Sequence, residues 1–327
     1  MNKYNPKISV IMPAYKAANY LAEAIDSALA QTYDNVEIIV VNDGSPDDGA
    51  TREVAMRYEG KIRYFEKVNG GSSSAINVGI DNMEGEWFAW LSHDDLFKPD
   101  KLKSQVDFLN TLVERGDKVE DHILFTGSDL IDKDGKLIRK TDMSALCALS
   151  EKIERMTGNE YLVCEPTVYN FHGCGCLIHK DAMIKVGRFD EKLRLLNDVD
   201  VWYRLYTAGY KLHLIPEVLV SGRVHASQVS TAIGYSYHNP EQDMFWNRSL
   251  DWLIENHPDN YELYYLYGRN AYLKTRYAEG DRAFAHAKKI CPSKSAKLAT
   301  VKAVTKTRAA VRNVLKKIYL KVKVRKG

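Results

Sequence analysis

The chain has 327 residues, of which 45% are hydrophobic, and this suits one large globular domain or two ordinary ones. No apolar run approaches the roughly 18 residues that a membrane-spanning helix needs, which argues against an integral membrane protein. The first residues lead into a predicted strand without a signal-peptide layout, and five cysteines without zinc-type spacing favour reduced thiols in a cytosolic protein.

Charge is unevenly distributed along the chain. Residues 294–327 hold 12 of the 46 basic residues and no acid, so the preceding residues carry 34 basic and 43 acidic side chains. Apolar residues recur in this tail at three- and four-residue spacing, namely Val301, Val304, Val311, Leu315, Ile318 and Val322. The tail is therefore predicted to be an amphipathic helix on an anionic membrane surface. Packing of the stripe on the protein's own helices and binding to nucleic acid are the alternatives.

The first hundred residues alternate predicted strands and helices. Strands are predicted over residues 7–12, 36–41, 61–65 and 86–91, and helices over residues 20–31, 47–58, 72–83 and 99–114. The second of these strands is apolar along nearly its whole length, as expected when both faces of a sheet are covered. This order predicts an α/β fold with a doubly wound, mostly parallel sheet and helices on both faces.

The pattern changes after this region. The turn residues at 132–135 predict a hairpin, and residues 167–179 predict a strand and a loop. Further predictions are a helix over 198–208, two short strands around Pro216 within 210–220, and two helices over 261–290. The last pair fits either one tetratricopeptide-like unit or a simple helical appendage. The predicted divisions are 1–232 for the α/β domain, 233–293 for a helical extension and 294–327 for the basic tail.

Asp94 and Asp95 end the apolar strand Trp87–Leu91 and are the most informative pair in the chain. Ligands of open α/β sheets bind beyond the carboxyl ends of the strands. Two adjacent carboxylates there repel each other unless a cation lies between them and another group, and hard oxygen ligands suit Mg²⁺ or Mn²⁺. The pair therefore predicts a metal–diphosphate site, with capping of the next helix as the alternative.

The ends of the first two strands carry groups that suit a nucleobase. Pro13 and Tyr15 end the first strand, and Asp43 begins the turn after the second. The Tyr15 ring offers a stacking surface, worth about 1–3 kcal/mol per base, and the Asp43 carboxylate can accept from a base N–H. The alternative is that Asp43 only caps the following helix and that Asp43-Gly44 is a turn.

The loop after the third strand is rich in glycine and serine. Asn69, Gly71 and Ser72 lie where the next helix begins, and helix N-terminal N–H groups favour anions. A diphosphate is therefore the expected ligand of this loop. The loop has neither a Walker lysine nor the G-x-G-x-x-G pattern of dinucleotide-binding folds.

Taken together, these four strand ends resemble those of the family 2 glycosyltransferases with the GT-A fold. The resemblance covers about residues 6 to 232. It rests on Val10–Tyr15, Val41–Ser45, Asn69–Ser72 with Ala75 and Asn77, Ser92–Asp95, Gly187–Glu191 and Asn197–Trp202.

The resemblance implies a role for each matched residue. Tyr15 and Asp43 would hold the base of a nucleotide-sugar. The family's Asp-x-Asp pattern falls on Ser92, His93 and Asp94, so Asp94 would remain the metal ligand and Asp95 would assist near the donor sugar. Serine replaces the first acid, and Ile76 stands where the family usually has an arginine.

The family's catalytic base lies in a Glu-Asp pair that opens a late helix. Asn197-Asp198 occupies that place, which implies that Asp198 deprotonates the acceptor hydroxyl. A helix N-terminus would stabilise the Asp198 anion and keep it unprotonated at pH 7. A plain N-cap is the alternative for Asp198, and Asp200 is the second choice for the base.

The segment from Arg223 to Ser230 resembles the family's late loop over the diphosphate. His225 would complete the metal shell, or Arg223 would pair with phosphate. A surface or packing role is the alternative for His225.

The resemblance implies an inverting, metal-dependent transfer of a hexosyl or deoxyhexosyl group from a UDP- or dTDP-linked sugar to a saccharide or lipid-linked saccharide. Such a protein would assemble bacterial surface polysaccharide at the inner face of the cell membrane, peripherally attached, with no nucleic-acid partner. The alternatives are a nucleotide-sugar binding protein without turnover, which retention of Asp94 and Asp198 disfavours, and a nucleotidyltransferase. The latter would need a basic, glycine-rich loop after the first strand, where the chain has Pro13-Ala14-Tyr15.

Overall fold

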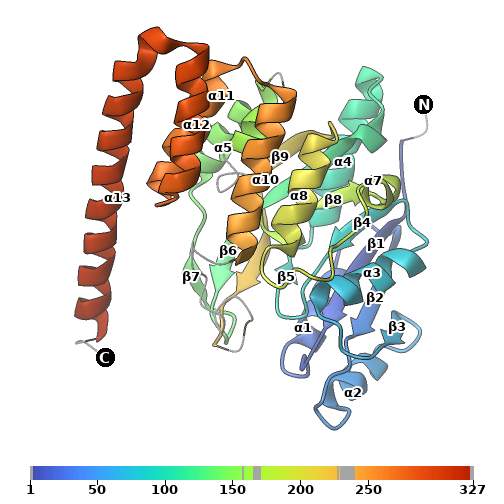
Figure 1. The fold of residues 1–327 in the computed structure, drawn as a ribbon. Coiled ribbons are helices and arrows are strands. Elements are labelled where there is room, and N and C mark those ends of the chain that lie inside the picture. Colours follow the sequence, from blue (N-terminus) through green and yellow to red (C-terminus); the bar gives the residue numbers. More distant parts are fainter. Residues whose placement is uncertain (1–2, 157, 165–170, 227, 229–239, 325–327) are drawn as a thin grey trace. The chain divides into compact units, whose positions relative to one another are not determined.

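The computed structural model describes residues 3–156, 158–164, 171–226, 228 and 240–324, with side chains of the last helix described up to Val311. The chain divides into two compact units (Figure 1). Unit 1 comprises Met1–Thr157 and Asn170–Gly234, and unit 2 comprises Gly158–Tyr169 and Tyr235–Gly327. The predicted boundary between residues 232 and 233 lies outside the described residues, as does the start of the strand predicted from Thr167.

The first half of unit 1 is a parallel sheet with the strand order β3-β2-β1-β4. Its strands are β1 (Ile8–Ala14), β2 (Val36–Asn42), β3 (Arg63–Glu66) and β4 (Trp87–Trp90). Helices α1 (Leu21–Leu29), α2 (Ala50–Met56) and α3 (Ser72–Asn82) connect them (Figure 1). Every residue of β1 and β4 is buried, because helices cover both faces of a doubly wound sheet.

The second half of unit 1 extends the sheet with strands of both directions. After β5 (Leu96–Phe97) and α4 (Lys101–Arg115) come β6 (His122–Ile131), β7 (Leu137–Arg139), β8 (Leu177–His179) and β9 (Lys211–Arg223). The strand β8 runs antiparallel to β4 on one side and to β6 on the other, while β6 and β9 are parallel. The mostly parallel α/β sheet predicted from the sequence is confirmed, with β8 inserted antiparallel between β4 and β6, β5 antiparallel to β9 at the end of the strand order, and β7 antiparallel to β6.

Residues 211–220 form part of one strand, and the prediction of two short strands around Pro216 is wrong. In the pairing of β9 with β6, Ile215 lies opposite Thr126 and Val218 opposite Gly127, so Pro216 and Glu217 form a bulge. Proline has no N–H for the ladder and is tolerated at such a bulge, and the strand therefore continues past it to Arg223.

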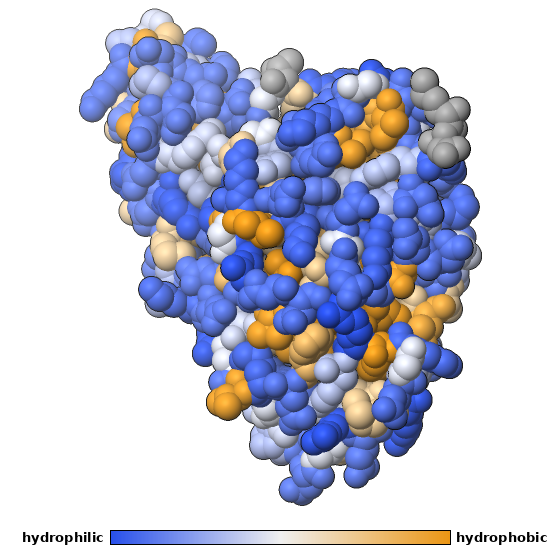
Figure 2. Space-filling view, turned by 90° about the vertical axis from the view of Figure 1, so that its right-hand side faces the viewer, coloured by the Kyte–Doolittle hydropathy of each residue, from blue (hydrophilic) through white to orange (hydrophobic). Residues whose placement is uncertain are grey.

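The hairpin predicted at residues 132–135 is confirmed, because β6 and β7 pair across it. Among the described residues, unit 1 also contains the α-helices α5 (Met143–Glu154), α7 (Lys180–Lys185) and α8 (Asn197–Thr207). Figure 2 shows one face of the molecule on which hydrophilic residues cover most of the surface and hydrophobic residues form patches across the middle.

Unit 2 is helical. It contains α6 (Glu160–Cys164), α10 (Pro240–Asn256), α11 (Tyr261–Leu273), α12 (Tyr277–Ile290) and α13 (Ser295–Val324). The two helices predicted over residues 261–290 are confirmed. They cross closely at two glycines, since a Cβ atom on Gly268 would lie 2.6 Å from the Phe284 ring and one on Gly280 would lie 2.5 Å from the Tyr272 ring.

Lysines along the start of the basic tail lie over tyrosine rings of α11 and α12. Their Nζ atoms lie 4.1–5.6 Å from the ring centroids, in the pairs Lys294–Tyr261, Lys297–Tyr265, Lys302–Tyr272 and Lys306–Tyr277. We call these four pairs the lysine–tyrosine ladder. Leu298, Thr305 and Ala309 are buried on the same side of α13.

Of the apolar stripe predicted in the tail, Val301 is half-buried and the next two members are exposed. Val304 and Val311 are exposed by 44% and 53%, and the side chains of Leu315, Ile318 and Val322 lie outside the described part of the structure. No helix in the described residues is long and apolar enough to span a membrane.

Candidate active site

The loops that follow β1, β2, β3 and β4 carry the predicted ligand-binding residues. They lie at one edge of the sheet because these four strands are parallel. Contacts between loops confirm that they converge. Nδ1 of His93, after β4, lies 3.3 Å from the carbonyl oxygen of Pro13 at the end of β1. A Cβ atom on Gly44, after β2, would lie 2.8 Å from the backbone nitrogen of Asn69, after β3. The loops are therefore packed against one another rather than merely close.

Asp43 organises the loop that follows β3. Its buried carboxylate accepts from the N–H groups of Gly70 at 2.9 Å and Gly71 at 2.7 Å. It also accepts from Lys67 Nζ at 2.9 Å and from Asn69 Nδ2 at 3.1 Å. Both carboxylate oxygens thus have two donors from the chain itself. The base contact implied for Asp43 stays a prediction, and what the geometry adds is its role as the anchor of this loop.

Tyr15 presents its ring to solvent at the end of β1, with 40% of the residue exposed. Behind it, Lys16 N donates to Ser45 Oγ at 2.9 Å, which joins the loops after β1 and β2. Asn42, the last residue of β2, accepts from Ser45 Oγ at 2.7 Å and donates to the Tyr64 hydroxyl at 2.9 Å. The exposed Tyr15 ring is carried by a loop that is fixed by hydrogen bonds, and such a ring suits stacking on a nucleobase.

The glycine-rich loop leads into α3 and meets the start of α8. Gly71 has φ +92°, a conformation that favours glycine, immediately before Ser72 opens the helix. The buried side chain of Asn197 donates from Nδ2 to Ser73 Oγ at 3.1 Å and to Ser72 Oγ at 3.3 Å. The N-termini of α3 and α8 are therefore joined, and Asp198 lies beside the loop predicted to hold the diphosphate.

Asp94 faces the loop after β9. Its Oδ2 atom lies 3.0 Å from His225 Nε2 and accepts from Gln228 Nε2 at 3.0 Å. Burial raises the pKa of Asp94, but the charge of His93 and the hydrogen bonds from Gln228 and His225 outweigh it, so the pKa lies below its usual value. The carboxylate therefore stays ionised, as a metal ligand must be.

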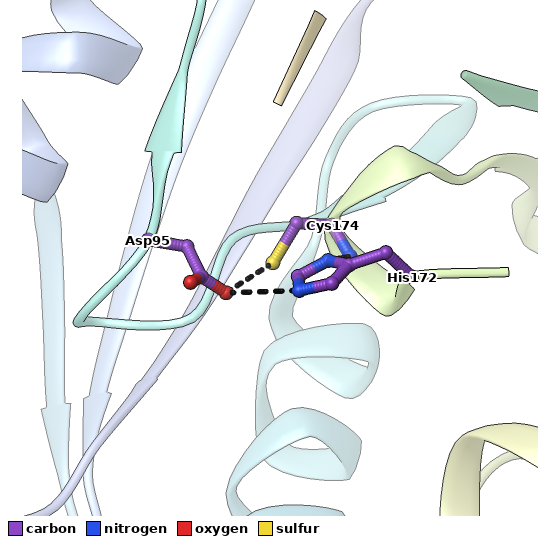
Figure 3. A group of neighbouring side chains, drawn as sticks. All are labelled: Asp95, His172 and Cys174. Carbon is purple, nitrogen blue, oxygen red and sulfur yellow. Dashed lines mark hydrogen bonds and ion pairs between the residues drawn. The ribbon is translucent and has the colours of Figure 1, made fainter. Parts of the chain in front are cut away.

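Asp95 lies close to His172 and Cys174, two residues that sequence reasoning missed (Figure 3). Its Oδ1 atom accepts from Arg223 N at 2.8 Å, and its Oδ2 atom lies 3.2 Å from Cys174 Sγ and 3.7 Å from His172 Nε2. Burial raises the pKa of Asp95, and the neighbouring charge of Asp94 acts in the same direction. Adjacent carboxylates in the sequence thus occupy different surroundings.

Arg223 holds these loops together. Its buried guanidinium donates from Nε to Asp94 O at 2.8 Å and from Nη2 to Glu23 Oε2 at 2.8 Å. Nη1 donates to Lys133 O at 3.1 Å in the β6–β7 hairpin, and the group stacks over the Tyr20 ring at 4.6 Å. These contacts give Arg223 a holding role, and its pairing with phosphate stays a prediction.

Asp198 is half-buried in the first turn of α8. Burial raises the pKa of Asp198 to about 6, although the hydrogen bond from Val199 N at 2.7 Å and the charge of His172 act in the opposite direction. The helix N-terminus alone would have lowered this pKa. A value near 6 still leaves most of the carboxylate ionised at pH 7.

Asp200, the second choice for the base, is engaged differently. It is buried and accepts from Arg204 Nε at 2.8 Å, and the same arginine donates to the backbone oxygen of Arg188 at 2.5 Å. This ion pair connects α8 to the preceding loop, which is a structural role. Asp198 therefore suits proton transfer better than Asp200 does.

Among the residues that the structure describes, two groups have the chemistry of metal ligands. Asp94 and His225, the pair predicted to hold a metal, offer an oxygen and a nitrogen 3.0 Å apart, and their role as ligands stays a prediction. Asp95, His172 and Cys174 form a second group whose ligand atoms all lie within 4.8 Å of one another. The sequence signal for the second group is weak, because Asp95 lies 77 residues before His172 and 79 before Cys174 and meets them through the insertion of β8 beside β4.

Comparison with known proteins places the chain among glycosyltransferases. The family model "Glycosyl transferase family 2" matches residues 9–187. An uncharacterized glycosyltransferase of Rickettsia felis is 41% identical over 256 residues, which are 78% of this chain and 40% of that protein. The minor teichoic acid biosynthesis protein GgaB of Bacillus subtilis is 30% identical over 276 residues, 81% of this chain and 28% of that protein. The chain thus spans less than half the length of these two relatives.

Solved structures show the same fold at low sequence identity. Residues 1–349 of TarS from S. aureus, in complex with UDP-GlcNAc, match with a TM-score of 0.60 and 14% identity over 93% of this chain and 90% of that chain. The mannosyltransferase PcManGT from Pyrobaculum calidifontis, in complex with GDP-Man and Mn²⁺, matches with a TM-score of 0.55 and 17% identity over 95% of this chain and 88% of that chain. The GT-A fold predicted from the sequence is confirmed.

Proposed function

The chain belongs to glycosyl transferase family 2, and we propose that it transfers a sugar from a nucleotide-diphosphate-sugar to a hydroxyl acceptor with inversion at the anomeric carbon. The observation that carries this proposal is Asp198, a half-buried carboxylate whose pKa of about 6 suits a general base at neutral pH. It lies beside the loop at the start of α3, to which Asn197 is hydrogen-bonded.

The chemistry is a single displacement. Asp198 accepts the proton of the acceptor hydroxyl while the oxygen of that hydroxyl attacks the anomeric carbon, and the bond from this carbon to the diphosphate oxygen breaks. The glycine-rich loop and the N-terminus of α3 would hold the diphosphate, and Tyr15 would stack on the base. No nucleophile from the protein is required.

We propose Mn²⁺ or Mg²⁺ as the cofactor, held by Asp94 and His225. The residues fit such an ion, because an ionised carboxylate and an imidazole lie 3.0 Å apart and leave further positions for phosphate oxygens. A nitrogen ligand favours Mn²⁺ over Mg²⁺. Bound there, the ion would supply Lewis-acid stabilisation of the charge on the departing diphosphate.

The proposed donor is a UDP- or dTDP-linked hexose or deoxyhexose, and the proposed acceptor is a saccharide or a lipid-linked saccharide in bacterial cell-surface polymer assembly. GgaB, by its name, acts in teichoic acid biosynthesis, and the TarS structure holds UDP-GlcNAc, which support a UDP-sugar and a cell-wall polymer. The GDP-Man in the mannosyltransferase structure is the reason to include GDP-sugars in the test.

The test is release of nucleoside diphosphate from a panel of UDP-, dTDP- and GDP-linked sugars, with and without saccharide acceptors. We expect one donor to raise the melting temperature and to yield nucleoside diphosphate at a rate that an acceptor increases. Release of pyrophosphate would instead indicate a nucleotidyltransferase. A donor that raises the melting temperature but yields no nucleoside diphosphate with any acceptor would indicate a nucleotide-sugar binding protein.

We further propose that residues 1–232 form the catalytic domain, 233–293 a helical extension and 294–327 a basic tail that lies on the anionic inner face of the cell membrane. The support for the tail is its charge and its apolar stripe, of which Val304 and Val311 are exposed. The protein would then be peripheral and cytoplasmic, close to lipid-linked acceptors. Nucleic acid is not a proposed partner.

A further inference from the structure

Three side chains with different metal-ligating atoms meet at Asp95, the residue that follows Asp94. The group consists of Asp95 after β4 and of His172 and Cys174 just before β8 (Figure 3). Asp95 and Cys174 are buried, while His172 is half-exposed. The proposed transfer reaction uses neither His172 nor Cys174.

The spacing of the three ligand atoms suits a tetrahedral metal ion. Asp95 Oδ2 lies 3.2 Å from Cys174 Sγ and 3.7 Å from His172 Nε2, and all three atoms lie within 4.8 Å of one another. Metal–ligand bonds of 2.0 Å to oxygen or nitrogen and 2.3 Å to sulfur place ligand atoms about 3.3–3.5 Å apart around a tetrahedral ion. Small side-chain movements would therefore bring all three atoms into coordination.

We propose that Asp95, His172 and Cys174 bind a thiophilic divalent cation, with Zn²⁺ as the best match. Carboxylate, imidazole and thiolate together are a ligand set of zinc sites with three protein ligands, and sulfur disfavours Mg²⁺. On binding, the thiol of Cys174 gives its proton to solvent and the thiolate binds the ion. The half-exposed edge of His172 leaves a route of entry.

The proposed site is separate from the position given to Mn²⁺ or Mg²⁺. Asp94 Oδ2 faces His225 and Gln228, whereas Asp95 Oδ2 faces Cys174 and His172. The backbone N–H of Arg223 holds the other oxygen of Asp95 at 2.8 Å, so this carboxylate is turned toward the sulfur. The two aspartates therefore present their carboxylates to different ligand sets.

Binding has one structural cost and one structural effect. The backbone N–H of Cys174 now donates to His172 Nδ1 at 3.3 Å, and a metal on Nε2 would move the ring proton to Nδ1 and replace this long hydrogen bond. The ion would also connect the loop after β4, through Asp95, to the segment before β8, through His172 and Cys174. The bound cation is thus expected to stabilise unit 1 and to restrict Asp95.

The test uses the full chain, stripped with chelator and titrated with Co²⁺, whose bond to a thiolate gives a charge-transfer absorption in the near ultraviolet. We expect this band in the wild type, its loss on titration with Zn²⁺, and a rise in melting temperature with Zn²⁺. Cys174→Ser and His172→Asn should each lose both the band and the thermal shift. Cys176→Ser, a buried thiol two residues away, is the matched control and should keep both.

Asp94→Asn distinguishes the two sites. Retention of the cobalt band in this variant supports a separate site, whereas its loss would place the ion at the Asp94 position and overturn the inference. Absence of the band in the wild type, or its survival in Cys174→Ser, would also overturn it. If Cys174→Ser does not fold, His172→Asn and Asp95→Asn take its place, and survival of the cobalt band and the thermal shift in these variants would overturn the inference. None of these readouts depends on glycosyl transfer, so the inference and the proposed function can fail independently.

Discussion

The guanidinium of Arg223 donates from Nε to the backbone carbonyl oxygen of Asp94 at 2.8 Å, although 129 residues separate the two in the chain. The backbone N–H of the same arginine donates to the Asp95 carboxylate at 2.8 Å. One residue at the end of β9 therefore sets the position of both acids after β4. This relationship makes Arg223 a determinant of site geometry as well as of stability.

Replacement of Arg223 by lysine should lower the free energy of unfolding by about 2–3 kcal/mol, because an ammonium group cannot donate along several directions and leaves buried acceptors without partners. Chemical denaturation measures the loss. Glu23→Gln is the control, since Glu23 is 56% exposed and its ion pair should contribute less than about 1 kcal/mol. Equal stability of Arg223→Lys and wild type would refute the holding role.

Asp198→Asn should reduce transfer about 10²- to 10⁴-fold while donor binding stays nearly intact, because the side chain is proposed to act only in the chemical step. Steady-state kinetics with the identified donor, together with calorimetric donor binding, separates the two effects. Asp200→Asn is the control. It should lower stability through loss of the Arg204 ion pair but keep the chemistry. Near-normal turnover in Asp198→Asn would assign the base elsewhere.

The rate of the chemical step should depend on pH with a midpoint near 6. Below the pKa of Asp198, about 6, the base is protonated and kcat should fall about tenfold per pH unit, while above it kcat should level off. The direction follows from burial, which raises this pKa above that of an ordinary aspartate. A profile that is flat down to pH 4.5 would contradict the assignment.

Asp94→Ala should weaken donor binding and abolish the response of activity to Mn²⁺ or Mg²⁺, because the variant lacks the ionised carboxylate that faces His225. Activity is measured in chelator and after metal is returned. Asp34→Ala is the control and should behave as wild type, because this exposed acid precedes the first residue of β2, whereas the predicted ligand residues follow the last residues of the strands. Full activity of the wild type in excess EDTA would refute metal dependence.

The tail should bring the protein to anionic vesicles. A chain ending at Ala310 keeps the lysine–tyrosine ladder and removes residues 311–327, so it tests the outer half of the tail without disturbing α11 and α12. The full chain should float with phosphatidylglycerol vesicles and the shortened chain should not. Neutral phosphatidylcholine vesicles are the control. Equal flotation of both chains would place the contact elsewhere.

The strand ends were predictable from sequence because each carries its signal locally. Tyr15, Asp43 and Asp94 follow apolar runs directly, and parallel strands bring such ends to one edge. The resemblance to a family added the role expected of Asp198. The same local logic explains why the hairpin at 132–135 was predicted correctly.

The remaining contacts depend on long-range pairing that no local pattern carries. His172 and Cys174 reach Asp95 because β8 inserts antiparallel between β4 and β6. The four donors to Asp43 come from a loop some 25 residues away, so its anchoring role was invisible in the sequence. Pro216 was misread as a strand end because a bulge in β9 accommodates its missing N–H.

The lysine–tyrosine ladder divides the tail into halves that should respond differently to ionic strength. Contacts between an ammonium group and an aromatic face act over 4.1–5.6 Å here, well within the Debye length of about 8 Å at physiological salt, so screening should affect them little. Attraction of the outer lysines and arginines to a charged surface acts over longer distances and weakens as salt rises. Concentrated salt should therefore detach the protein from a membrane while the start of α13 stays bound to its own helices.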